Sequence, residues 1–232
     1  MKDHILGVRL FIFGRYGSLL IALLLVMLLQ PIVDTIVGKY LLEALFIITL
    51  LAGLRAIKDK KELLRFEVIL LVVSLALSIA GTIPGYEALF FTGIAGRALF
   101  MILVAVKILF DLFRSPKVTG DSLAGAVCIY LMIALIWGHL FLLVEFLLPG
   151  SFSFTHGDKA MALWLSREFY PFYYYSLITM TTVGFGDMLP LTSAARTLTT
   201  LEAIIGQVYL TILVARLVGM YSVTPKNNKH DA

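Results

Sequence analysis

The run from Thr181 to Asp187, Thr-Thr-Val-Gly-Phe-Gly-Asp, is the part of the chain best suited to binding an ion. If several backbone carbonyl oxygens face one axis, they can replace the hydration shell of a cation. A regular strand alternates its carbonyls, so this arrangement needs unusual dihedral angles, and Gly184 and Gly186 allow a positive φ without a Cβ penalty. The Thr182 hydroxyl adds an oxygen at one end, and the Asp187 carboxylate attracts cations at the other.

The composition predicts that this run lies within an integral membrane protein. The chain has 232 residues, of which 60% are apolar and only 15% are charged, whereas a soluble domain carries about a quarter charged residues. Irregular backbone survives at membrane depth only against protein or beside a water-filled path. A pore gives a physical reason for a glycine-rich run between two long apolar segments.

Six apolar segments come close to the roughly 20 residues that a membrane-spanning helix needs, which indicates an all-α membrane protein. The six predicted helices cover residues 17–37, 40–57, 66–83, 88–113, 122–148 and 194–221. A shorter helix over residues 171–181, opened by Pro171, is expected to enter the membrane without crossing it. Its C-terminal, negative dipole end would then point toward the membrane centre. We therefore predict a re-entrant pore helix and filter loop between the fifth and sixth helices.

Basic residues predict the orientation of the chain in the membrane. Five of them lie between residues 55 and 65, at and after the end of the second helix, whereas residues 81–93 contain none. Because Lys and Arg concentrate in cytoplasmic loops, we expect both termini to be cytoplasmic and the protein to lie in the plasma or inner membrane. The predicted division is a peripheral four-helix domain over residues 1–118, a pore domain over 119–222 and a disordered cytoplasmic tail over 223–232.

The stretch from Tyr174 to Pro190 closely resembles the pore of tetrameric potassium channels, and the resemblance covers residues 122–221. Six helices with the pore last are also the plan of voltage-gated channels, so the chain is expected to be similar to a bacterial six-transmembrane member of this family. The resemblance implies a homotetramer in the lipid bilayer that conducts K⁺ passively and needs no cofactor beyond the permeant ions. Carried over residue by residue, it implies K⁺-binding carbonyls at Thr182, Val183, Gly184 and Phe185, with the Thr182 hydroxyl, and Gly186 completes the signature.

The resemblance also implies supporting and gating residues. Thr181 and Asp187 flank the filter, and Glu145 resembles an acidic residue that braces the pore loop. Gly206 stands nineteen residues after Asp187, where the inner helix of the family has its hinge glycine. The residues expected to face the central cavity in the same register are Gln207, Leu210 and Val214.

Two positions depart from the common pattern of the family. Phe185 stands where many members have Tyr, so a ring hydroxyl that can tether the filter is lost. Ile178 stands where some bacterial relatives have Glu paired with the outer Asp, so Asp187 needs another partner. For Glu202, in the sixth helix, we expect a pair with Arg196 or Arg167, or a place at the outer vestibule.

The fourth helix predicts weak voltage dependence or none. A sensor helix carries a basic residue at every third position, but this helix has only Arg97, Lys107 and Arg114. Each charge that crosses the field contributes only about 2.3 kcal/mol per 100 mV, so steep gating needs several.

Other functions fit the sequence less well. A weakly selective cation channel is one, because Phe185 and Ile178 alter the support of the filter. A K⁺ transporter is another, although such proteins usually carry internal repeats and this chain has one filter-like loop. A non-conducting regulatory subunit is a third. An enzyme is not expected, since no nucleophile–base pair or metal-ligand spacing is apparent, and neither is a nucleic-acid partner, since there is no basic stripe.

Overall fold

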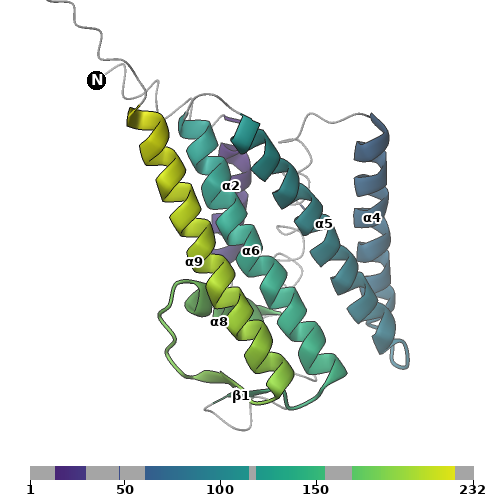
Figure 1. The fold of residues 1–232 in the computed structure, drawn as a ribbon. Helices are drawn as coiled ribbons and strands as arrows, with labels where there is room; N and C mark the ends of the chain where they lie inside the picture. Colours follow the sequence, from purple (N-terminus) through teal and green to yellow (C-terminus); the bar gives the residue numbers. More distant parts are fainter. Residues whose placement is uncertain (1–13, 30–46, 48–60, 115–118, 155–168, 223–232) are drawn as a thin grey trace, which may run out of the picture.

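The computed structural model describes residues 14–29, 47, 61–114, 119–154 and 169–222. Within these ranges the chain forms six helices and one two-stranded antiparallel sheet (Figure 1). The helices are α2 (Gly17–Leu28), α4 (Lys61–Ala80), α5 (Glu87–Arg114), α6 (Gly120–Leu147), α8 (Tyr170–Met180) and α9 (Ser193–Ser222), and the strands are β1 (Phe152–Phe154) and β2 (Met188–Pro190).

Three of the described helices, α5, α6 and α9, are long and apolar enough to cross a membrane. This finding supports an all-α membrane protein, and the predicted count of six spans stays a prediction. The predicted second helix, 40–57, lies almost wholly outside the described residues, and so does the predicted tail over residues 223–232.

The first helix is shorter than predicted. It ends at Leu28, not at residue 37, and the Leu29 amide closes it by donating to the Leu25 carbonyl over 3.0 Å. The sequence contains a reason, because the residue before a proline is disfavoured in the helical conformation and Pro31 follows closely.

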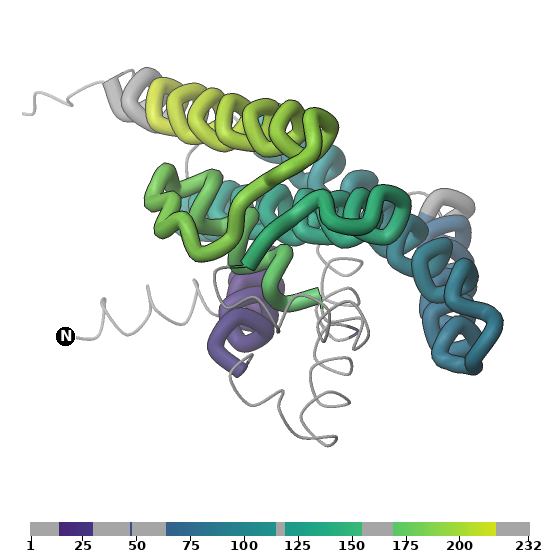
Figure 2. The backbone as a smooth tube through the Cα atoms, turned by 90° about the horizontal axis from the view of Figure 1, so that it is seen from below, coloured from purple at the N-terminus to yellow at the C-terminus, as the bar shows by residue number. Residues whose placement is uncertain are grey.

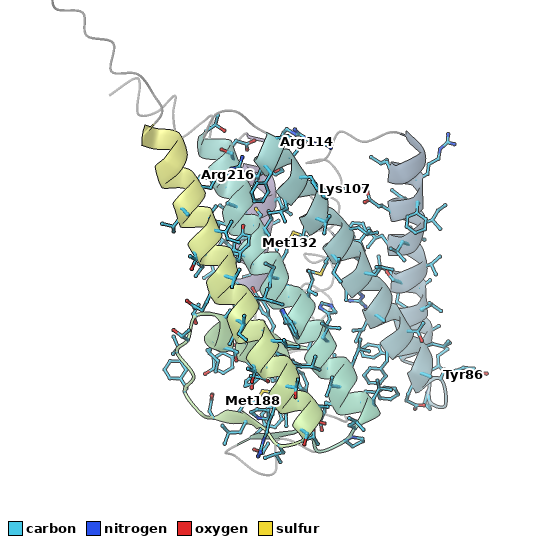
Figure 3. The ribbon with its side chains drawn as sticks, viewed as in Figure 1. Tyr86, Lys107, Arg114, Met132, Met188 and Arg216 are labelled. Atoms are coloured by element: carbon cyan, nitrogen blue, oxygen red, sulfur yellow. The ribbon has the colours of Figure 1, made fainter. Side chains whose placement is uncertain are left out.

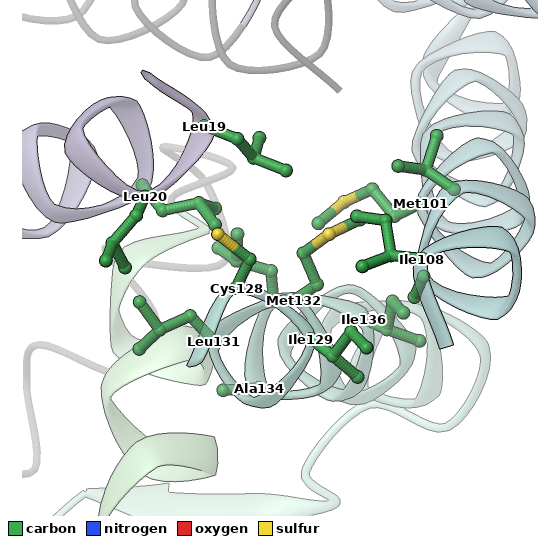
Figure 4. Packing of buried hydrophobic residues seen from close by; sticks show 14 of the residues in the cluster. Leu19, Leu20, Met101, Ile108, Cys128, Ile129, Leu131, Met132, Ala134 and Ile136 are labelled. Atoms are coloured by element: carbon green, nitrogen blue, oxygen red, sulfur yellow. The ribbon is translucent and has the colours of Figure 1, made fainter. Parts of the chain in front are cut away.

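The helix α6 forms the centre of the fold and packs against α2, α5, α8 and α9 (Figure 2). In the most apolar 18-residue stretch of α6, 61% is buried inside the structure, whereas in the corresponding stretch of α9 only 11% is buried. The side chains that hold α2 and α5 to α6 form one apolar cluster (Figure 4), in which Leu19 and Leu20 of α2 and Met101 and Ile108 of α5 lie on either side of Met132. Burial of these side chains stabilises the packing of α2 and α5 on α6. Hydrogen bonds also join Tyr16, just before α2, to α6: its amide donates to the Asp121 Oδ1 over 2.9 Å, and its carbonyl accepts from the Cys128 Sγ over 3.6 Å.

Small residues bring α4 and α5 together. A Cβ atom at Gly93 would lie 2.3 Å from the Ser78 Oγ, and one at Gly96 would lie 2.8 Å from the Ser74 Cβ. Small residues spaced in this way let two helix backbones approach closely within a membrane. The helix α4 therefore belongs to the fold through its contact with α5.

Candidate functional site

The run 181–187 alternates its backbone conformation. The φ angle is 62° at Thr182, 53° at Gly184 and 78° at Gly186, whereas Val183 and Phe185 between them do not have positive φ. An alternation of left-handed and right-handed residues turns every second peptide over, so that successive carbonyls can share one side of the chain. Positive φ was expected at the two glycines. Thr182 was missed, since a left-handed threonine is strained and nothing local in the sequence indicates it.

The backbone amides at the start of this run are tied back to α8. The Thr182 amide donates to the Thr179 carbonyl over 3.0 Å, and the amides of Val183 and Gly184 donate to the Ile178 carbonyl over 2.9 and 3.2 Å. These carbonyls belong to the last turn of α8, which has no further helical amides to bind. The helix end thus holds the amides of the first half of the run.

Aromatic packing sets the position of α8. Its eleven residues span roughly 16 Å, about half the hydrocarbon thickness of a bilayer, and Pro171 opens it at the position where a missing amide does no harm. The centroid of the Tyr175 ring lies 5.3 Å from that of Phe141 in α6 and 5.5 Å from that of Phe152 in β1. A Cβ atom at Gly138 of α6 would lie 3.0 Å from the Tyr173 Cα, so that glycine allows the close approach of α8.

Asp187, at the end of the run, has a partner that the sequence did not reveal. The Tyr174 hydroxyl donates to the Asp187 Oδ2 over 2.9 Å. The two residues are 13 positions apart across the end of a helix, so no helical or strand period relates them. Ile178 lies in the buried apolar cluster around α8 instead.

Glu145 organises the turn that leads out of α6. Its Oε1 accepts from the Gly150 amide over 2.8 Å, and its Oε2 accepts from the Phe152 amide over 3.0 Å. Phe152 begins β1, which pairs with β2 in the register Phe152↔Pro190 and Phe154↔Met188. Since β2 begins directly after Asp187, where Figure 3 labels Met188, Glu145 has a physical route to support the end of the run.

Glu145→Gln is expected to lower the free energy of unfolding by about 1–2 kcal/mol, because the amide keeps one acceptor and turns an N–H donor toward a backbone donor. Thermal unfolding of the purified protein in detergent measures this change. Glu87→Gln is the matched control, since the Glu87 Oε1 accepts from the Gly85 amide over 3.1 Å in an exposed loop. Equal stability of Glu145→Gln and wild type would exclude a bracing role.

Residues of α9 contact the end of α8. A Cβ atom at Gly206 would lie 3.2–3.3 Å from atoms of Met180, so this glycine has a packing reason, and its role as a hinge stays a prediction. The Gln207 Nε2 donates to the Met180 carbonyl over 3.2 Å. Farther along α9, Leu210 is half-buried and Val214 is exposed, and their place at a cavity also stays a prediction.

Glu202 is fully buried and accepts a hydrogen bond from the Ser176 hydroxyl of α8. The expected pair with Arg196 and the expected place at an outer vestibule are therefore wrong, and Arg196 instead donates to the Pro190 carbonyl over 3.1 Å. Glu202 lies three residues after Thr199, on the α9 face that packs against α8, and Thr199 bonds the Tyr175 hydroxyl there. Arg167 lies outside the described residues.

Lys107 of α5 and Arg216 of α9 each contact a neighbouring helix. Lys107 pairs with Glu67 of α4, whose side chain is 1% exposed. Arg216 of α9 donates to the Leu112 carbonyl at the end of α5 and lies 4.7 Å from the Phe113 ring. Figure 3 shows Arg216 and Arg114 at the same end of the molecule, opposite Met188. The fourth predicted helix, α5, is thus joined to α4 by an ion pair of Lys107 and to α9 through its Leu112 carbonyl.

Within one chain the run is open to its surroundings. Every residue from 181 to 187 is exposed, and Phe185 has an exposed fraction of 70%. The neighbouring helix α9 also presents large apolar side chains, each more than 40% exposed, at Leu201, Ile204, Ile205, Val208, Ile212 and Val214. The run in one chain therefore offers backbone carbonyls, the Thr182 hydroxyl and the Asp187 carboxylate as oxygen ligands for a cation.

Residues 126–222 match the model of a protein family described as "Ion channel". The matched segment covers most of α6 and the whole stretch from β1 through α8, the run 181–187 and α9. The match supports an ion channel that is embedded in a membrane. No curated protein and no solved structure matches the chain.

Proposed function

We propose, with the ion channel match of residues 126–222 as the premise, that the protein is a potassium-selective channel that conducts K⁺ passively through a homotetrameric pore. The observation that carries the proposal is the alternation of φ at Thr182, Gly184 and Gly186, together with amides tied back to α8. These features support a column of carbonyl oxygens on one side of the run.

The proposed mechanism follows from the chemistry of this column. A K⁺ ion loses water and gains carbonyl oxygens from residues 182–185 of four chains, with the Thr182 hydroxyl at the inner end. Several adjacent sites, each of moderate affinity, allow ions to enter and leave by mutual repulsion. The Asp187 carboxylate, exposed at the other end, raises the local cation concentration, and α8 directs its negative dipole end toward the ions.

The rest of the chain is proposed to form a peripheral domain around this pore. Six membrane-spanning helices, cytoplasmic termini and a re-entrant α8 fit the distribution of apolar and basic residues. Weak or absent voltage dependence is proposed because Lys107 is paired with the buried Glu67 and Arg97 is itself buried. Moving these charges through the field would break contacts between helices.

Reconstitution of the purified chain in liposomes tests this function. We expect K⁺ flux, a reversal potential near that of K⁺ in mixed K⁺ and Na⁺, and a conductance that changes little with voltage. Equal K⁺ and Na⁺ permeability would instead indicate a weakly selective cation channel. Flux coupled to a second ion would indicate a transporter, and the absence of flux would indicate a non-conducting subunit. A steep conductance–voltage curve would contradict the proposed role of α5.

A further inference from the structure

Glu202 is a buried acidic residue for which conduction as described above has no use. Its side chain is 0% exposed, its Oε1 accepts from the Ser176 hydroxyl, and its Oε2 has no hydrogen-bond partner among the described residues. Burial of a carboxyl group is costly unless hydrogen bonds compensate for the lost water. An apolar side chain of similar size would avoid that cost, so we ask what the carboxyl group contributes at this position.

The contact between α8 and α9 supplies the answer. Among the described side chains, three hydrogen bonds join the two helices: Tyr175 to Thr199, Ser176 to Glu202, and Gln207 to the Met180 carbonyl. Of these, the bond between Ser176 and Glu202 is the one whose two residues are both fully buried. Exchange with water therefore weakens it least, and in a medium of low dielectric constant a hydrogen bond is electrostatically stronger.

The position of α8 is transmitted directly to the run 181–187. Ser176 lies about 9 Å along the helix from Thr182 at 1.5 Å per residue. Between them, the Ile178 and Thr179 carbonyls accept from the amides of Thr182, Val183 and Gly184. A displacement of α8 relative to α9 would therefore move the carbonyls of Thr182 and Val183 as well.

We propose that Glu202 is a positioning residue for ion selection, which acts through Ser176 to set the distance of α8, and with it the filter carbonyls, from α9. The inference rests on the proposed channel function. Binding sites lose selectivity when their groups move by more than about 0.5 Å. The property of Glu202 that matters is its oxygen acceptor at a fixed place, not its negative charge.

The test compares two substitutions of similar size in the full chain, reconstituted in liposomes. Glu202→Leu removes both acceptors. We expect the K⁺/Na⁺ permeability ratio to fall about tenfold, since the free energy of one buried hydrogen bond corresponds to about a tenfold change in an equilibrium constant. Glu202→Gln keeps an acceptor for Ser176 and is expected to stay within about twofold of wild type. Ser176→Ala is expected to lower the permeability ratio as much as Glu202→Leu does. The variant that combines Ser176→Ala with Glu202→Leu should have a ratio no lower than either single variant, since both remove the same hydrogen bond.

Glu67→Leu is the matched control. Glu67 is as buried as Glu202, but it pairs with Lys107 far from the filter. We expect lower thermal stability with an unchanged permeability ratio. If Glu202→Leu does not assemble, Ser176→Ala and Glu202→Gln decide the question.

An unchanged ratio in Glu202→Leu or Ser176→Ala would overturn the inference. So would a loss in Glu202→Gln equal to that in Glu202→Leu, because the charge would then be the active property. A wild-type protein without K⁺ selectivity would overturn the proposed channel function instead.

Discussion

Gly184→Ala is expected to reduce K⁺ flux into liposomes by more than tenfold. Gly184 has φ of 53°, and an L-residue in that region costs about 1–2 kcal/mol, or about 4–8 kcal/mol when summed over four proposed copies. A competing orientation of the peptide with negative φ would then dominate and turn a carbonyl away from the column. No atom lies within 4 Å of the added Cβ in the single chain, so the expected effect comes from the backbone and not from a clash.

Gly85→Ala is the control for this prediction. Gly85 also has positive φ, 90°, and also has open space around an added Cβ, but it lies in the turn between α4 and α5. The same kind of strain is therefore introduced away from the filter, and flux should stay at the wild-type level. Normal K⁺ conduction by Gly184→Ala would show that the assignment of residues 182–186 as a selectivity filter is wrong.

Tyr174→Phe is expected to make K⁺ flux decay about fivefold faster during a sustained gradient, since a lost hydrogen bond of about 1 kcal/mol shifts a conformational equilibrium by that factor. The substitution removes only the hydroxyl that donates to Asp187. The backbone near Asp187 then loses one of its links to α8, while α8 keeps its aromatic packing. The time course of flux after an imposed K⁺ gradient measures the change.

Tyr170→Phe is the control for the tether. Tyr170 lies one turn before Tyr174, with ring centroids 6.4 Å apart, and it is 41% exposed. Its hydroxyl can be removed with the same change of volume, and the decay should match wild type. If Tyr174→Phe also decays at the wild-type rate, the bond to Asp187 has no part in holding the filter.

Much of the site could be predicted because local chemistry determines it. Glycines at 184 and 186 permit left-handed backbone, Pro171 opens a short helix, and long apolar runs end where α5, α6 and α9 end. Each signal rests on residues near one another in the chain. The predicted end of the first helix was wrong for a related reason, because apolar residues continue past Leu28 although Pro31 disfavours a helix just before it.

The contacts that support the site could not be predicted in this way. β1 and β2 have three residues each, and more than 30 residues lie between them, so neither strand has a detectable period. Glu202 is an acidic residue in an apolar helix, and the sequence alone suggested an arginine partner where the structure has a serine. Only the packing of α8 against α9 determines which polar groups meet.

The sequence by itself determined the kind of backbone that could select an ion, the helices on either side of it and the weak charge pattern of α5. These properties depend on side-chain type and spacing over a few turns. The tertiary structure decided which groups hold that backbone: Tyr174 for Asp187, Ser176 for Glu202, and the Gly150 and Phe152 amides for Glu145. Such hydrogen bonds act over about 3 Å, so they exist only after apolar burial has brought separate elements into register.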